Sequence, residues 1–163
     1  MIGTISAGEE DVAFEFEVFV SAKLAEIEML ARKEGRTLRE AELEELLRKR
    51  FEAQRREFRV RHPGAKYEIV LYEDAPIGRM VTDASGDAIQ LIDLALIKPY
   101  RGLGIGSQLI RSLKRNAIVL GKPVTLTVEP DNPALRLFRR HGFELCGRTA
   151  ERLALVWELR GVE

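Results

Sequence analysis

The feature that most constrains this chain is the segment YRGLGIGS at residues 100–107, which follows the apolar run AIQLIDLALI at residues 88–97. Glycine loses more backbone freedom on folding than any other residue, so three glycines in five positions are costly where bare backbone is not needed. The run is apolar on both faces, as a strand covered on both sides must be. After Gly104, apolar residues recur at helical spacing as far as Leu120. The chain must therefore contain a central strand, a tight glycine turn and a helix, in that order.

A turn of this kind is suited to holding an anion. The first N–H groups of a helix have no partner inside the helix, and the helix dipole places partial positive charge there. Glycines allow an anion to approach the backbone, and Arg101 adds a fixed positive charge. The spacing Gly102-x-Gly104-x-Gly106 departs from the G-x-G-x-x-G dinucleotide fingerprint, and the loop ends in Gly-Ser-Gln rather than the Gly-Lys-Ser/Thr of a P-loop. A nucleotide-binding domain therefore fits this loop poorly, and we keep it only as the weakest interpretation.

The rest of the chain predicts a single domain over residues 1–163 with the order β-α-α-β-β-β-α-β-α-β-β. We expect a short strand at residues 2–6, a helix from about Asp11, and a second helix opened by a capping box at Thr37 and Glu40 and ending near Arg61. Three antiparallel strands joined by the turns EDAP and ASGD follow, the third over residues 88–97. After the helix 104–120, closed by Gly121, come a strand at 124–129, a short helix in NPALRLFRRHG and a final hairpin.

Composition excludes several classes of protein. The 163 residues suffice for one core, and 45% hydrophobic with 32% charged residues is typical of a soluble globular domain. Lys plus Arg and Asp plus Glu are both 26, which gives no overall attraction to nucleic acid or an anionic membrane. The single cysteine, Cys146, cannot form an internal disulfide or a cysteine zinc site, and we expect it to be a small core residue. The N-terminal residues MIGTISAGEEDV have no signal-peptide pattern, so we expect a cytoplasmic protein.

Two motifs together resemble a known family. Arg101-Gly102-Leu103-Gly104-Ile105-Gly106 resembles the R/Q-x-x-G-x-G/A pyrophosphate signature of the GCN5-related N-acetyltransferase (GNAT) family, whose members bind acetyl-CoA. Asn132-Pro133-Ala134, Leu137-Phe138 and Gly142-Phe143 resemble its N-x-x-A…L-Y-x-x-x-G-F segment. The resemblance covers roughly residues 11 to 159. It implies an α+β fold with a mixed, mostly antiparallel sheet flanked by helices, and with a splayed central pair of strands.

The resemblance also implies a set of cofactor-binding residues. The pantetheine arm would lie between the splayed strands, bonded to the main chain of Leu96 and Lys98, with a bulge near Leu96 directing its N–H at the thioester carbonyl. Arg101 would stand beside the pyrophosphate, and Asn132 and Phe138 would contact the cofactor from the other side. The pyrophosphate would sit on the N–H groups of Gly102, Leu103, Gly104, Ile105, Gly106 and Ser107.

The catalytic candidates are Asp93, Glu129, Leu96 and Tyr100. Asp93, expected on the same strand face as Ile89 and Leu91, would have a raised pKa suited to a general base, and Glu129 at the end of the other splayed strand is the alternative. Leu96 would supply the oxyanion donor. Phe138 stands where the family pattern commonly has a Tyr that protonates the leaving thiolate, so water or Tyr100 would have to take its place. His141, beside Gly142 at a helix end, is placed where a positive charge complements the helix dipole.

The resulting prediction is an acetyl-CoA-dependent N-acetyltransferase in which a primary amine attacks the thioester directly in a ternary complex. The alternative is a catalytically weak GNAT-fold module that keeps coenzyme A binding or serves interaction. The expected partners are acetyl-CoA, an unidentified amine and, as is common in the family, a second copy in a homodimer. We expect no metal, no nucleic acid and no membrane partner.

Overall fold

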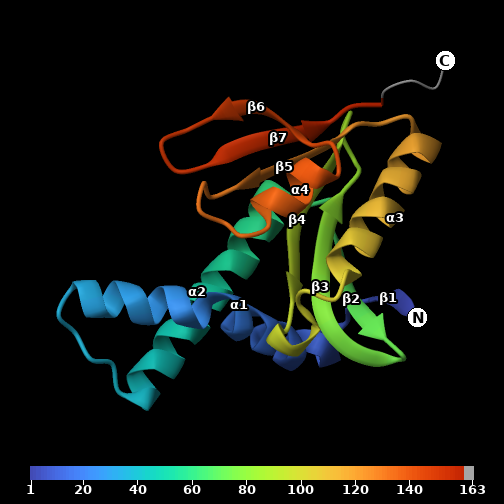
Figure 1. Ribbon diagram of the computed structural model, residues 1–163. Coiled ribbons are helices and arrows are strands. Elements are labelled where there is room, and N and C mark those ends of the chain that lie inside the picture. Colours follow the sequence, from blue (N-terminus) through green and yellow to red (C-terminus); the bar gives the residue numbers. More distant parts are fainter. Residues whose placement is uncertain (160–163) are drawn as a thin grey trace.

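In the computed structural model, which describes residues 1–159, seven strands form one sheet in the order β1-β2-β3-β4-β5-β7-β6. The strands are β1 Ile2–Ser6, β2 Lys66–Tyr72, β3 Ala75–Asp83, β4 Ile89–Leu96, β5 Val124–Val128, β6 Glu144–Arg148 and β7 Leu153–Trp157. All neighbours are antiparallel except β4 and β5. The predicted mixed, mostly antiparallel sheet and its order of elements are confirmed (Figure 1).

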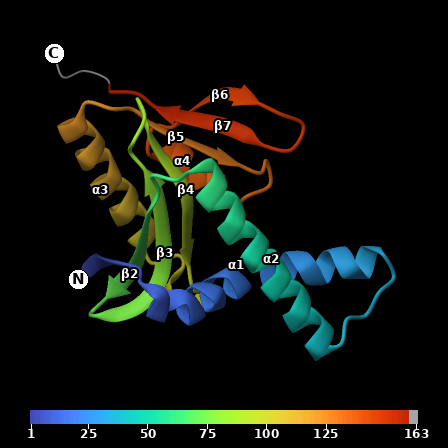
Figure 2. The ribbon, with the colours of Figure 1, turned by 180° about the vertical axis from the view of Figure 1, so that it is seen from behind.

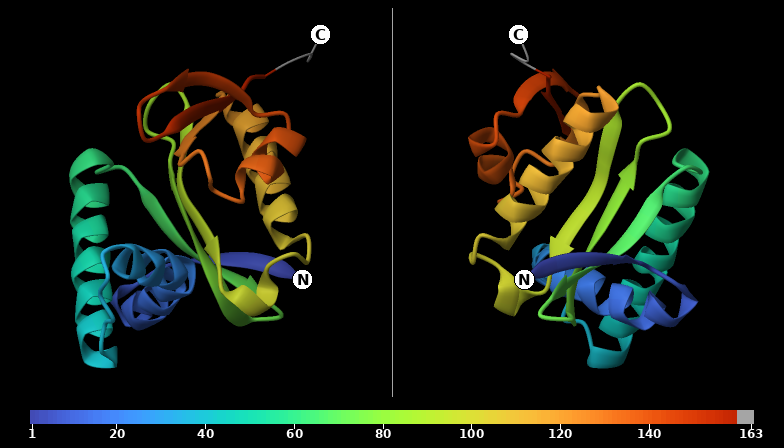
Figure 3. Two further views of the ribbon diagram at one scale, coloured as in Figure 1. Left: turned by 60° about the vertical axis from the view of Figure 1, so that its left-hand side comes forward. Right: turned by 90° about the vertical axis from the view of Figure 1, so that its right-hand side faces the viewer.

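Helices cover both faces of this sheet. The helices are α1 Val12–Lys33, α2 Glu40–Arg61, α3 Ile105–Leu120 and α4 Leu135–Arg140, with short 3₁₀ turns at Glu9–Asp11 and Lys98–Tyr100. Figure 3 shows α1 and α2 on one side of the sheet and α3 and α4 on the other. Seen from behind in Figure 2, α2 crosses α1, and the far ends of both helices extend beyond the sheet.

Two hydrophobic clusters hold these layers together. The larger one fills the space between the sheet and α3, with Val70, Leu91, Ile110 and Leu155 among its buried members. The smaller one lies between α1 and α2 and is built on four buried side chains, Phe19, Ile27, Leu47 and Phe51. The helical spacing of apolar residues therefore buries one stripe of each helix where α1 and α2 meet, and α1 in addition buries Val18 outside this cluster.

A register shift in β4 overturns one expectation about the site. Val81 pairs with Asp93, but the next residue of β3, Thr82, pairs with Leu91, so Ile92 is an extra residue in the strand. Because side chains alternate along a strand, one inserted residue moves every later side chain to the opposite face. The sequence predicts that Asp93 and Leu91 share a strand face, and this prediction is wrong: the two side chains lie on opposite faces. The bulge expected near Leu96 lies at Ile92 instead.

Three smaller expectations are also wrong. The helix α2 begins at Glu40 with Arg39, in an extended conformation, as its N-cap, so Thr37 does not cap it; Leu38 packs against the α1–α2 cluster. Cys146 is exposed rather than in the core, since every residue of the edge strand β6 is exposed. Leu120, the last apolar residue of the helical pattern and therefore expected on its buried stripe, is 53% exposed, because α3 leaves the core after Ala117.

Candidate functional site

The candidate site is centred on the place where β4 and β5 separate. These strands pair only at Ile89–Val124 and Gln90–Thr125, although both continue beyond these residues. At the far end of β4, the N–H of Ile97 donates to the carbonyl of Ile77 on β3 at 2.9 Å. Because successive N–H groups of a strand point to opposite edges, the N–H and C=O of Leu96 face away from β3, toward the gap between β4 and β5.

The glycine loop joins this open edge to the start of α3. Gly102 and Gly104 have φ angles of 74° and 82°, a region that favours glycine, and a Cβ on either residue would meet no atom within 4 Å. Gly104 is the N-cap of α3, and no side chain caps the helix. The N–H groups of Ile105, Gly106 and Ser107 therefore have no partner within α3. This combination suits a phosphate group.

The third glycine has a different task. A Cβ on Gly106 would lie 3.1 Å from Cδ2 of Leu137, so the absence of a side chain lets α4 pack closely on the first turn of α3. Phe138 of the same helix is 5% exposed and its ring packs against Phe143 at a centroid distance of 5.5 Å. Phe138 is thus a core residue, whatever its relation to a bound cofactor.

Arg101 does not extend along the glycine loop. Its Nε donates to the carbonyl of Leu96 at 2.8 Å, and its Nη2 donates to the carbonyl and to Oγ of Ser21 in α1 at 3.1 and 3.2 Å. Both main-chain groups of Lys98 also have partners: its N–H donates to Ser21 Oγ, and its carbonyl accepts from the N–H of Arg101, each at 3.2 Å. Ser21, which no sequence signal marks, therefore ties α1 to the end of β4.

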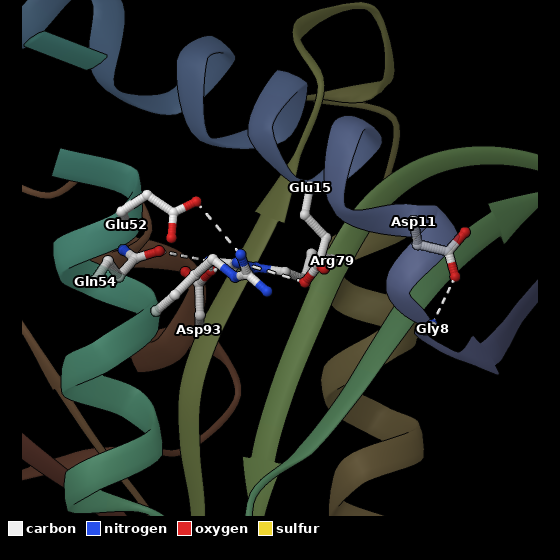
Figure 4. A network of polar contacts seen from close by, with 8 residues as sticks. Gly8, Asp11, Glu15, Glu52, Gln54, Arg79 and Asp93 are labelled. Atoms are coloured by element: carbon white, nitrogen blue, oxygen red, sulfur yellow. Dashed lines mark hydrogen bonds and ion pairs between the residues drawn. The ribbon is translucent and has the colours of Figure 1, made fainter. Parts of the chain in front are cut away.

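Asp93 lies in a buried ion cluster between the sheet and the helices α1 and α2 (Figure 4). Arg79 of β3, only 2% exposed, donates from Nε to Oδ2 of Asp93 at 3.0 Å, and its Nη2 contacts the same oxygen. The same guanidinium donates to Gln54 of α2 at 2.8 Å and lies 3.6 Å from Oε1 of Glu15 of α1. Four elements are thus joined through one buried charge.

Two further groups in this layer have shifted pKa values. Burial raises the pKa of Glu15, although Arg79 and Arg55 act in the opposite direction. Burial also raises the pKa of Tyr67, whose buried hydroxyl has no hydrogen-bond partner within residues 1–159. Glu15 and Asp93 thus share the guanidinium of Arg79 from opposite sides of this layer.

Glu129 lies at the other side of the gap, directly after β5. Its carboxylate is 3.5 Å from Nη1 of Arg152. Burial acts to raise the pKa of Glu129, but a hydrogen bond from its own N–H, the charges of Arg152 and Lys23, and a hydrogen bond with Asn132 outweigh it, and the pKa is lowered. Glu129 is consequently ionised at neutral pH. Oδ1 of Asn132 also accepts from the N–H of Ala134 at 2.9 Å, which fixes the chain before α4.

Tyr100 is turned away from the gap. Its ring packs against Tyr72 of β2 with a centroid distance of 5.9 Å, and two strands, β3 and β4, lie between β2 and β5. The structure therefore groups Leu96, the glycine loop and Glu129 around the gap between β4 and β5, while Asp93 is held by Arg79 and Tyr100 by Tyr72. Such an arrangement can bind an extended ligand that carries a phosphate group. The N–H of Leu96 and the carboxylate of Glu129 would then face the end of the ligand that lies in the gap.

Comparison with known proteins agrees with this geometry. The profile of the Acetyltransferase (GNAT) family matches residues 27–143. A search of curated proteins found no match to this chain.

Several solved structures have the same fold. The PaiA N-acetyltransferase from Thermoplasma acidophilum, in complex with coenzyme A, superposes with a TM-score of 0.71 at 15% identity, covering 97% of this chain and 99% of that one. An acetyltransferase from Thermus thermophilus gives a TM-score of 0.66 at 20% identity, covering 98% and 97%. A GNAT family acetyltransferase from Elizabethkingia anophelis with acetyl-CoA bound gives 0.53 at 16% identity, covering 60% and 78%. Within residues 1–159, no helix has the length and apolarity that a membrane crossing requires.

Proposed function

Because this chain belongs to the GNAT family of acetyltransferases, we propose that it transfers the acetyl group of acetyl-CoA to a primary amine by direct attack in a ternary complex. The observation that carries the proposal is the early end of the β4–β5 ladder beside a glycine-built helix N-terminus. Two of the structures with this fold contain coenzyme A or acetyl-CoA, which supports the choice of acyl donor.

The residues around the gap fit such a donor. The N–H groups of residues 102–107 would hold the pyrophosphate, where the helix dipole and the left-handed glycines favour an anion. The acyl end of the donor would reach the N–H of Leu96, because the carbonyl of Leu96 already accepts from Arg101 and both main-chain groups of Lys98 have partners inside the protein. The N–H of Leu96 would also stabilise the developing oxyanion, and removing one such donor costs about 2.7–4 kcal/mol in activation free energy.

Glu129 is the better placed of the two candidate bases. It is ionised at neutral pH and lies at the end of the splayed strand, whereas the guanidinium of Arg79 already occupies Oδ2 of Asp93. An ionised carboxylate in this position accepts the proton of the incoming ammonium directly or through one water molecule, although its lowered pKa makes it a weaker base than an ordinary glutamate. Asp93 would instead maintain the buried cluster.

No side chain near Phe138 is required to protonate the leaving thiolate. A thiol has a reference pKa of about 8.5, so its release as a thiolate at pH 7 is unfavourable by only ~1.5 pKa units, or about 2 kcal/mol. Water supplies that proton at a modest cost in rate, which favours an enzyme over a catalytically weak coenzyme A-binding module. Turnover with any amine separates the two functions.

The first experiment is calorimetric titration with acetyl-CoA, coenzyme A and NADH. We expect acetyl-CoA and coenzyme A to bind and NADH to bind far more weakly. Leu103 is 65% exposed in the loop, so Leu103→Glu adds a negative charge without straining a glycine, and we expect it, like Gly104→Glu, to lower the affinity at least tenfold. Gly86→Glu, where a Cβ meets no atom within 4 Å, is the matched control. If acetyl-CoA does not bind to the unmodified protein, the proposed function is wrong.

A further inference from the structure

The contact between the end of α4 and the first turn of α3 includes a polar pair that the proposed function does not use. Nε2 of His141, the residue after α4, lies 3.0 Å from Oγ of Ser107. Ser107 is the third residue of α3, and its N–H is one of those without a partner at the helix start. The two residues are 34 positions apart in the chain, so the fold itself brings this imidazole to the helix N-terminus.

The pair is held rigidly on both sides. Leu137, one turn earlier in α4, packs over Gly106. Lys114 of α3 donates from Nζ to the main-chain carbonyl of His141 at 2.8 Å, and its ammonium lies 5.2 Å from the ring centroid of Trp157 in β7. These contacts fix where the imidazole stands relative to the first turn of α3. A rigid donor or acceptor at a helix start is the kind of group that sets the direction of a neighbouring hydroxyl.

We propose that His141 is a cofactor-positioning residue: Nε2–H of its imidazole donates to Ser107 Oγ and so directs the Ser107 hydroxyl hydrogen at the pyrophosphate of coenzyme A. The inference rests on the proposed function and adds two side chains to the main-chain phosphate site. Ser107 contacts the phosphate, and His141 acts through Ser107. In this arrangement the imidazole of His141 donates one hydrogen bond to Ser107 Oγ, and the Ser107 hydroxyl accepts that bond and donates one to the pyrophosphate.

The charges around His141 make this role measurable. Burial and the neighbouring cations Lys114, Arg111 and Arg140 lower the pKa of His141, so it is neutral at pH 7, contrary to the positive charge expected from its place at the helix end. On the side of β6 and β7, Glu144, Trp157 and Glu158 line the groove beside Gly142. A bound pyrophosphate would bring negative charge to the first turn of α3 and raise the pKa of His141. Binding would then take up protons, and affinity would rise as the pH falls toward 6.

The test is titration calorimetry of the full chain with coenzyme A and with dephospho-coenzyme A, which keeps the pyrophosphate but lacks the 3′-phosphate. We expect Ser107→Ala and His141→Leu each to weaken both ligands roughly tenfold, as removal of one hydrogen bond to a charged group does. The double variant should bind no more weakly than either single one, since the two residues act in series. His141→Gln, which keeps a donor near the position of Nε2, should restore affinity to within about threefold of the unmodified protein.

Two further readouts separate positioning from a merely structural role. Titrations at about pH 6.5, near the reference pKa of histidine, in two buffers of different ionisation enthalpy should show proton uptake on binding that His141→Leu abolishes. His62→Leu, at the other histidine, should leave it unchanged. Normal affinity in Ser107→Ala, additive losses in the double variant, a loss confined to coenzyme A, or no proton uptake would each overturn the proposal while leaving the proposed function standing. If the unmodified protein binds no coenzyme A at all, both fail together.

Discussion

Asp93 and Glu129 are chemically similar side chains whose surroundings give them different tasks. Arg79 is buried, and it would be left as an unpaired charge if Asp93 and Glu15 were both removed. Breaking a buried ion pair from one side is strongly destabilising, because the partner keeps its desolvation cost. Glu129 sits between the positive charges of Arg152 and Lys23 and stays ionised to a lower pH than an ordinary glutamate. Burial near a splayed strand is therefore not enough to identify a base.

This contrast predicts different outcomes for two isosteric changes. Once an acceptor amine is found, Glu129→Gln should lower kcat/KM by roughly 10²–10⁴-fold and leave the Kd of acetyl-CoA unchanged. Asp93→Asn should lower the free energy of unfolding by about 1–3 kcal/mol, because Arg79 keeps Glu15 as an ionic partner, with a smaller effect on kcat in the folded fraction; urea denaturation at about pH 7 measures the change. A larger loss of kcat in Asp93→Asn than in Glu129→Gln would assign the base to Asp93.

The lowered pKa of Glu129 also fixes the sign of a pH effect. A carboxyl group whose pKa in the folded protein lies below its unfolded value stabilises the fold above the unfolded pKa, and that contribution is lost as the pH falls through the folded pKa. For Glu129 this window lies below about pH 4.5. Glu129 consequently does not account for a rate that falls between about pH 7 and pH 5, whereas protonation of the substrate amine does.

At the scale of elements, β3 and β4 are joined more closely than their sequences indicate. A Cβ on Gly78 of β3 would lie 2.4 Å from the main-chain carbonyl oxygen of Ala95, and Gly78 pairs directly with Leu96. The backbone cannot move away cheaply, because β3 is paired on both edges. The position of the Leu96 N–H therefore depends on a glycine outside the motif that identifies the family.

Gly78→Ala should lower the free energy of unfolding by about 1–3 kcal/mol, as overpacking does, and should weaken acetyl-CoA binding by displacing Leu96. Gly3→Ala in the edge strand β1 is the matched control, since a Cβ there meets no atom within 4 Å. Denaturation and calorimetry on both variants make the comparison. Unchanged affinity in a folded Gly78→Ala variant would show that the pantetheine arm does not use Leu96.

The sequence predicts the boundaries of elements that carry a local signal. It does not predict the placement of a side chain that depends on how strands or helices pair. The strand Ile2–Ser6, the end of α2 at Arg61 and the glycine cap of α3 at Gly121 follow from alternation, the His-Pro-Gly sequence and αL geometry. The face of Asp93 depends on one extra residue at Ile92, which only the register with β3 defines. The partner of His141 is likewise a residue of a different helix, so no local pattern points to it.

At the scale of the whole molecule, the sheet separates the side of α3 and the glycine loop from the side of α1 and α2, which have a core of their own. The glycine loop and α3 belong to the larger cluster, whereas α1 and α2 pack on each other through the smaller one. The layer between the smaller cluster and the sheet is the ion cluster of Arg79 together with buried apolar residues such as Val18 and Ile69. Packing defects in the α1–α2 cluster should therefore reach the glycine loop only weakly.

Leu47→Ala and Leu113→Ala test this separation, because both residues are leucines at 4% and 5% exposure in different clusters. Each should lower the free energy of unfolding by about 2–5 kcal/mol. At a temperature where both variants are folded, we expect Leu47→Ala to keep the Kd of acetyl-CoA within about twofold and Leu113→Ala to weaken it several-fold, since Leu113 packs α3 onto the sheet. Saturating acetyl-CoA at about 100 times its Kd should stabilise Leu47→Ala by the same ~2.7 kcal/mol as the unmodified protein. Equal losses of affinity in the two variants would mean that the two sides of the sheet are coupled, and α1 and α2 would then take part in cofactor binding through Ser21 and Arg101.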